Sequence, residues 1–213
     1  MPLFKTIPVT GGIIGVWELT ETSGELLDFF SQEEIVNTDF SKYTYEKRKV
    51  EWLASRVILK QLIGSEFKIS YSETGKPILH HSKYKHLSIS HSRNFAAVFV
   101  HEDREVGIDI ESMTRNYNSI EKRYLSDVEL IEVGQNPLLQ CLYWCAKEAI
   151  FKLVPFQGVE FREQILISPF NPETEIHFQS RFITPNHETK YQLSYIVFSD
   201  HCMAWTTSQN TDI

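Results

Sequence analysis

The sequence lacks several features that would indicate secretion or membrane insertion. No stretch of its 213 residues approaches the roughly 18 consecutive apolar residues of a transmembrane helix, and we expect no membrane partner. The N-terminal stretch MPLFKTIPVTGGIIGVW has no charged segment followed by a long apolar one, so we expect no secretory signal. Cysteine is scarce, because only Cys141, Cys145 and Cys202 occur, in no disulfide-framework spacing. The expected location is the cytoplasm.

Other absences narrow the class of function. The net charge is −7, with 21 basic and 28 acidic residues, so no general basic surface for nucleic acid is expected. No Cys-x-x-Cys pair or paired histidine spacing accompanies Cys141 and Cys145, which we interpret as core residues rather than zinc ligands. No Gly-x-Ser-x-Gly segment is present, and Ser90 and His91 face opposite ways on a strand. They do not form a hydrolase pair.

Apolar periodicity predicts two long helices and several strands. The first helix runs from Tyr43 to Gly64, where one apolar stripe ends in a glycine stop. The second begins at Pro137 and ends before Pro155. Strands are predicted where side chains alternate or run apolar, over residues 86–90, 95–100, 105–111, 191–198 and 202–208.

These segments repeat along the chain at a nearly constant spacing. The stretch WLASRVILK begins at Trp52 and WCAKEAIFK begins at Trp144, 92 residues later. Gly15 and Gly107 occur at the same offset of 92 residues. The order and spacing predict two similar halves that divide near residues 102–105. The alternative is coincidence between common helix and strand patterns.

The stretch VGIDIE carries two carboxylates on one face of a predicted strand. Asp109 and Glu111 are two residues apart, so their side chains point the same way. Trp17 and Leu19 stand at the corresponding positions of the first half. The acids are therefore not a requirement of the repeated pattern. The plainer interpretation is an edge strand with a solvated acidic face.

The second helix adds a further carboxylate. Glu148 and Lys152 lie four residues apart and share one face, whereas the first half has Arg56 where Glu148 stands. A surface ion pair is the plainer interpretation. If Glu148 converges with Asp109 and Glu111, each close pair repels by about 4 kcal/mol at an effective dielectric constant of 20 and 4 Å separation. Such a cluster needs a counter-ion, and ligands with oxygen donors alone favour Mg²⁺ or Mn²⁺.

Five stretches together resemble the motifs of one family. VGIDIE and WCAKEAIFK, preceded by RKVEWLASR, TGKP and SISHS, are similar to motifs of the 4′-phosphopantetheinyl transferases, in the family's order over residues 45–155. The internal repeat resembles the two-lobed, surfactin-type branch. The resemblance implies a monomeric α+β fold of two similar lobes related by pseudo-twofold symmetry, each a small antiparallel sheet packed on a long helix. Residues 1–104 would form the coenzyme A side and residues 105–213 the metal-binding lobe.

The resemblance also implies a reaction. The phosphopantetheine arm of coenzyme A is transferred to a serine of an apo acyl or peptidyl carrier protein, and adenosine 3′,5′-bisphosphate is released. By motif position, Asp109, Glu111 and Glu148 would bind Mg²⁺, and Glu148 would take the proton of the serine. Asp109 and Lys152 would contribute to catalysis and contact coenzyme A. The other implied coenzyme A ligands are Arg48, Arg56, Lys76, Ser90 and His91.

Two other functions are compatible with these residues. A Mg²⁺-dependent nucleotide pyrophosphatase or phosphodiesterase would use the same three acids on water. A non-catalytic module that binds coenzyme A or a carrier is the other alternative. Such a module would have a degenerate site and would not need the three acids. Within the family pattern, Ser88 replaces a common asparagine and Cys145 a frequent hydroxyl residue.

Glu129 has two interpretations. In some relatives the matching acid is assigned a part in catalysis. Here it is also the last residue of the capping box Ser126-x-x-Glu129, which we predict to open a short helix. Its counterpart Glu34, after Ser31, lies in the half without the metal acids, so we predict that Glu129 is a helix cap.

Overall fold

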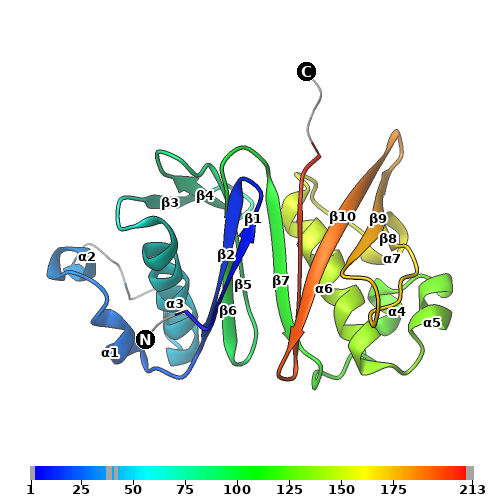
Figure 1. The fold of residues 1–213 in the computed structure, drawn as a ribbon, viewed down its shortest axis with the longest axis horizontal. Coiled ribbons are helices and arrows are strands. Elements are labelled where there is room, and N and C mark those ends of the chain that lie inside the picture. Colours follow the sequence, from blue (N-terminus) through cyan, green and yellow to red (C-terminus); the bar gives the residue numbers. More distant parts are fainter. Residues whose placement is uncertain (1–2, 37–39, 41–42, 210–213) are drawn as a thin grey trace.

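The structure is a computed structural model that describes residues 3–36, 40 and 43–209. It is a mixed α/β fold with two larger antiparallel sheets and one short hairpin (Figure 1). Within the described ranges, no helix is both long enough and apolar enough to span a bilayer.

The first sheet and its helices use the N-terminal part of the chain. Its strands are ordered β1-β2-β6-β5, and β3 and β4 form a separate hairpin. The elements are β1 (Lys5–Val9), β2 (Gly12–Glu18), α1 (Ser23–Leu27), α2 (Gln32–Val36), α3 (Glu46–Ile63), β3 (Lys68–Tyr71), β4 (Pro77–His80), β5 (His86–His91) and β6 (Phe95–His101).

The second sheet uses the remaining strands in the order β7-β11-β10-β9-β8. The elements are β7 (Val106–Ser112), α4 (Glu121–Tyr124), α5 (Asp127–Val133), α6 (Pro137–Leu153), α7 (Phe161–Gln164), β8 (Ile165–Ile167), β9 (His177–Thr184), β10 (His187–Phe198) and β11 (His201–Thr207).

Both long helices and the five listed strands are confirmed within a few residues at their ends. Helix α3 ends at Gly64, whose φ of +84° suits glycine. Helix α6 begins with Pro137 in its first turn, and the side chain of Asn136 caps the helix by accepting from the Leu138 and Leu139 N–H groups. Six strands were not predicted: β1, β2, β3, β4, β8 and β9. Alternation is not visible over the three or four residues of β3, β4 and β8.

The two sheets pack face to face between the two long helices. In Figure 1, α3 lies to the left of the strands, and α4, α5 and α7 lie to the right. The layer between the sheets holds Ile14, Val16, Phe95, Ala97, Phe99, Val106, Ile108, Ile110, Met203 and Trp205. A second core joins α3 to its sheet, and a third joins α6 to the other sheet. Cys141, Cys145 and Cys202 are free thiols buried in that third core, which confirms the interpretation of Cys141 and Cys145 as core residues.

Each long helix lies against a glycine of a strand. A Cβ atom on Gly107 of β7 would lie 1.8 Å from the Ala149 carbonyl oxygen of α6. A Cβ atom on Gly15 of β2 would lie 2.7 Å from Ile58 Cγ2 of α3. Both distances are shorter than a Cβ contact allows, so the missing side chain lets each helix approach its strand closely.

Strands β5 and β7 are edge strands of different sheets, and they lie alongside each other. Serine side chains on β5 bond to the backbone of β7. Ser88 Oγ accepts from the Ile108 N–H at 3.2 Å, and Ser90 Oγ accepts from the Ile110 N–H at 3.3 Å. These hydroxyls therefore satisfy N–H groups that an edge strand otherwise leaves unpaired.

Candidate active site

Asp109 lies at the centre of the predicted site. Ile108 and Ile110 face the layer between the sheets, so Asp109 points to the other face of β7, toward α6. Its side chain is buried, and Oδ1 accepts hydrogen bonds from Ser90 Oγ and from Lys152 Nζ, both at 2.7 Å. A solvated acidic face is therefore the wrong description of Asp109.

Lys152 pairs with Asp109 rather than forming the simple surface pair with Glu148. Its Nζ lies 2.7 Å from Asp109 Oδ1 and donates to the Ile108 carbonyl oxygen at 3.0 Å. An ammonium group has three donors, so one of them remains for a further acceptor.

Glu111 and Glu148 complete the acidic group. Burial is the main cause that raises the pKa of each carboxyl to about 7, and the charge of nearby Asp109 adds to it. The opposing influences are Arg115, which pairs with Glu111, and Lys152 near Glu148. Glu111 and Glu148 each lie near enough to Asp109 to be influenced by its charge.

The chemistry of this group fits a hard divalent cation. Every donor is a carboxylate oxygen, and Asp109 Oδ2 is buried without a hydrogen-bond partner. Such an atom is costly to bury unless a ligand compensates it. In the described part of the chain, however, no three His, Cys, Asp or Glu side chains are already arranged as a metal-ligand set. Lys152 and Arg115 currently occupy oxygens of Asp109 and Glu111.

His91, Glu51 and Arg48 form a group of ionisable side chains near Lys152. His91 is partly exposed, and Nδ1 lies 3.5 Å from a carboxylate oxygen of Glu51. Glu51 also pairs with Arg48 at 3.2 Å, although only 5% of its side chain is exposed. Burial lowers the pKa of His91, and the charges of Arg48 and Lys152 lower it further, against the effect of Glu51. His91, Arg48 and Lys152 are therefore close enough to interact. The sequence reasoning missed Glu51, which sits three residues after Arg48 in the RKVEW stretch.

Lys76 and Lys152 line one cavity of about 630 Å³. Lys76 Nζ donates to Glu105 at 2.8 Å and to the Leu153 carbonyl oxygen at 3.3 Å, so it joins the β3–β4 hairpin region to the end of α6. The other residues lining this cavity are Ser72, Thr74, Gly75, Pro77, Leu87, Ser88, Ile89, Phe151, Val154, Pro155, Phe156, Gln157 and Gly158.

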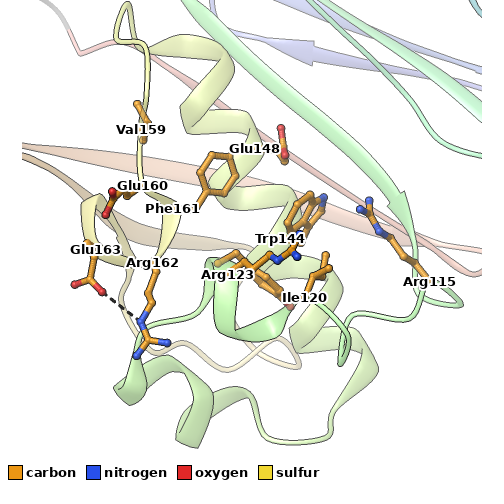
Figure 2. Close-up of a pocket in the computed structure, with 11 residues that line it drawn as sticks. Arg115, Ile120, Arg123, Trp144, Glu148, Val159, Glu160, Phe161, Arg162 and Glu163 are labelled. Carbon is orange, nitrogen blue, oxygen red and sulfur yellow. Dashed lines mark hydrogen bonds and ion pairs between the residues drawn. The ribbon is translucent and has the colours of Figure 1, made fainter.

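Glu148 lines a second cavity, of about 590 Å³, between α4, α6 and α7 (Figure 2). Part of its wall is aromatic, because the Trp144 ring contacts Tyr124 and Phe161 at centroid distances of 5.1 and 6.0 Å. Six charged residues also line it: Arg115, Arg123, Glu148, Glu160, Arg162 and Glu163. The Arg115 guanidinium lies 4.6 Å from the centre of the Trp144 ring. One turn of α6 thus carries Glu148 into one cavity and Lys152 into the other.

Two predicted ligands have different surroundings from those expected. Arg56 is buried, stacks on Trp52 at 4.1 Å and donates to the Tyr71 hydroxyl at 2.6 Å. Among the described residues, no hydrogen bond or ion pair joins Arg56 to the acids or to His91. Ser90 is also buried, and its hydroxyl already bonds to Asp109.

The predicted cap at Glu129 is confirmed. The Ser126 N–H donates to Glu129 Oε2 at 2.8 Å, and the Glu129 N–H donates to Ser126 Oγ at 3.3 Å. Oε2 also pairs with Lys147 Nζ at 2.7 Å, and Oε1 accepts from the Ile167 N–H at 2.8 Å. Lys147 is fully buried, so this ion pair is internal. The sequence reasoning did not foresee it.

Comparison with known proteins points to one family. Residues 105–206 match the family model of the 4'-phosphopantetheinyl transferase superfamily. The chain is 26% identical over 203 residues to the 4'-phosphopantetheinyl transferase HetI of Nostoc sp. PCC 7120, covering 84% of this chain and 78% of that protein. It is 31% identical over 112 residues to the 4'-phosphopantetheinyl transferase AcpT of Salmonella typhi, covering 49% of this chain and 58% of that protein. The AcpT of Escherichia coli K12 is 28% identical over 116 residues, covering 49% and 57%.

Proposed function

We propose that the chain, which matches the 4′-phosphopantetheinyl transferase superfamily over residues 105–206 and is similar to HetI, belongs to that family and transfers phosphopantetheine from coenzyme A to a serine of an apo carrier protein. The acceptor is an acyl or peptidyl carrier, and the released product is adenosine 3′,5′-bisphosphate. The observation that carries this proposal is the buried Asp109 carboxylate, which has one oxygen without a hydrogen-bond partner and pairs with Lys152. Lys152 lines one cavity, and Glu148 lines another.

The metal site of this proposal consists of Asp109, Glu111 and Glu148. These carboxylates would hold Mg²⁺, or Mn²⁺ in its place, and the cation would offset the burial and the mutual repulsion that raise the pKa of Glu111 and Glu148. When bound, the cation stabilises the negative charge that develops on the pyrophosphate.

The two cavities suit the two ends of coenzyme A. Lys76 and Lys152 give the larger cavity a positive charge for the nucleotide phosphates, and Lys152 retains one free donor for a phosphate oxygen. In the smaller cavity, the Tyr124, Trp144 and Phe161 rings offer an apolar surface for the uncharged pantetheine arm. The reacting phosphorus would then lie between them, beside Asp109 and Glu148.

Glu148 is the proposed base for the attacking serine. Its position in the wall of the second cavity leaves it open to a hydroxyl group that enters from the carrier.

The proposal extends to the organisation of the chain. Residues 1–104 would form the nucleotide-side lobe and residues 105–213 the metal lobe, as two copies of one ancestral unit with pseudo-twofold symmetry. Both walls of the cavity that holds Lys76 and Lys152 come from a single chain, so we expect an active monomer. Three free thiols fit a reducing compartment such as the cytoplasm.

Intact-mass measurement tests this function. The protein is incubated with coenzyme A, Mg²⁺ and a panel of apo carriers, each alongside a variant whose acceptor serine is alanine. We expect one phosphopantetheine to be added to a carrier with the serine and none to the alanine variant. Bisphosphate release without any carrier would instead favour the pyrophosphatase alternative.

A further inference from the structure

The Ser90 hydroxyl has no donor left for a substrate. It is 5% exposed, accepts from the Ile110 N–H at 3.3 Å and donates to Asp109 Oδ1 at 2.7 Å. A hydroxyl group has one hydrogen, and here that hydrogen is used on the carboxylate. The direct contact with coenzyme A that the motif implies for Ser90 would require this bond to break.

The bond to Ser90 makes the two oxygens of Asp109 unequal. Oδ1 accepts from both Ser90 and Lys152 at 2.7 Å, whereas Oδ2 is buried and has no partner. The donors come from strand β5 and helix α6, on different sides of β7, so they fix the rotation of the carboxylate. Only Oδ2 remains for a ligand.

We propose that Ser90 is a positioning residue that holds Asp109 so that Oδ2 is the oxygen offered to the divalent cation. This rests on the metal site of the proposed function and assigns a different role to Ser90. The serine reaches Asp109 only because β5 and β7 lie alongside each other as edge strands. The metal ligand in one sheet is therefore oriented by a side chain from the other sheet.

Ser88 provides a matched control two residues away on β5. It is as buried as Ser90 and accepts from the Ile108 N–H at 3.2 Å, so each serine bonds to one N–H group of β7. Ser88 does not share the bond to Asp109. Ser88→Ala therefore removes the backbone contact alone, whereas Ser90→Ala removes the backbone contact and the carboxylate contact.

Metal binding without coenzyme A separates the two roles. Mn²⁺ affinity is measured by titration calorimetry for the full chain and for Ser88→Ala, Ser90→Ala and Ser90→Thr, with thermal melting to confirm folding. Loss of a group that orients a metal ligand typically weakens metal binding by about 10- to 100-fold, which is the loss expected for Ser90→Ala. Ser90→Thr keeps the hydroxyl, and Ser88→Ala keeps the carboxylate contact, so both should bind Mn²⁺ close to the full chain's affinity.

The affinity for coenzyme A, measured in EDTA, tests whether Ser90 contacts the substrate directly. If Ser90 acts through Asp109, Ser90→Ala leaves metal-free coenzyme A affinity close to that of the unmodified chain. Weakened coenzyme A binding with unchanged Mn²⁺ binding would overturn the inference and return Ser90 to the substrate. Equal loss of Mn²⁺ affinity in Ser88→Ala would also overturn it.

The outcome distinguishes this inference from the proposed function. An unmodified chain that transfers phosphopantetheine and binds Mn²⁺, with a Ser90→Ala variant that binds Mn²⁺ equally well, refutes the role of Ser90 alone. An unmodified chain that neither binds Mn²⁺ nor modifies any carrier refutes the metal site and the proposed function together.

Discussion

The contact between β2 and α3 and the contact between β7 and α6 share their apolar framework and differ in their polar groups. Gly15 and Gly107 each admit a long helix to the strand surface. Two positions further along, Trp17 is buried in the core that joins α3 to its sheet, whereas Asp109 is buried against α6. The close helix–strand contact therefore forms with either a tryptophan or an acid at this position, which supports a functional reason for the acid.

The lysines at corresponding helix positions sharpen this contrast. Lys60 of α3 donates to the Phe29 carbonyl oxygen at 3.0 Å and pairs with Glu34. Lys152 of α6 also donates to a carbonyl oxygen and pairs with a carboxylate, but its partner is Asp109 on the strand. Lys60 thus holds the short helix α2 through Glu34. Lys152 instead belongs to the acidic site around Asp109.

The largest effect is expected from a methyl group at Gly107. Gly107→Ala would place Cβ 1.8 Å from the rigid Ala149 carbonyl oxygen, so we expect little folded protein. Gly15→Ala meets a side-chain methyl, Ile58 Cγ2, at 2.7 Å rather than backbone, and should cost about 1–3 kcal/mol of unfolding free energy. Urea denaturation measures both. Equal losses of unfolding free energy in the two variants would contradict the difference between a backbone contact at Gly107 and a side-chain contact at Gly15.

A large loss of stability is also expected from Glu129→Ala. The change leaves Lys147 buried without its partner, which typically costs about 3–5 kcal/mol and exceeds the loss of a cap alone. Its counterpart Glu34 is 38% exposed, so Glu34→Ala should cost about 1 kcal/mol, the scale of one lost cap. Glu129→Gln keeps the capping geometry and should retain substantial transferase activity in the molecules that fold. Abolition of turnover in folded Glu129→Gln would assign this residue to catalysis.

Turnover should fall by about 100- to 1,000-fold in Asp109→Ala and in Glu148→Ala, the range seen when a group that stabilises transition-state charge is removed. Trp17 and Arg56 occupy the corresponding positions of the first region, so the fold itself does not demand these acids. Steady-state kinetics with an apo carrier, together with melting curves, checks this. A collapsed melting temperature in both variants would point to a structural role instead.

The smallest effect concerns pH and metal. The pKa of Glu111 and of Glu148 is raised from 4.5 to about 7, so the folded, metal-free protein binds these protons more tightly than the unfolded chain. Its stability should fall as the pH rises from about 4.5 to about 7. Mg²⁺ competes with those protons, so it should raise the melting temperature more at pH 8 than at pH 6. Glu111→Gln combined with Glu148→Gln should remove the difference, and an equal gain at both pH values would argue against a metal at these acids.

Local patterns predicted the elements and residues that depend on neighbours in sequence. The helix stops, the capping box at Ser126 and the shared face of Asp109 and Glu111 all follow from spacings of two to four residues. The contacts that were missed join distant segments. Ser90 meets Asp109 because two sheet edges approach each other, and Glu129 meets Lys147 across two helices. The periodicity of apolar residues along the sequence does not predict contacts between distant segments.

The motifs also failed to predict some side-chain partners, because those partners lie in distant segments. Arg56 shares a helix with Arg48, but its side chain turns to Trp52 and Tyr71. Glu51 stands in the same motif as an ordinary helix acid, and only the approach of β5 brings His91 to it. Residue type and order produce the resemblance to the family, while the partner of each side chain depends on tertiary packing.

Removal and return of the metal tests the central claim most directly. The protein is stripped with EDTA and incubated with coenzyme A and an apo carrier, and modified carrier is measured by intact mass as Mg²⁺ is added back. We expect no modified carrier without metal, full modification with Mg²⁺ or Mn²⁺, and no recovery in Asp109→Ala. Carrier modification that continues under complete chelation would contradict the assignment of Asp109, Glu111 and Glu148 as the metal site.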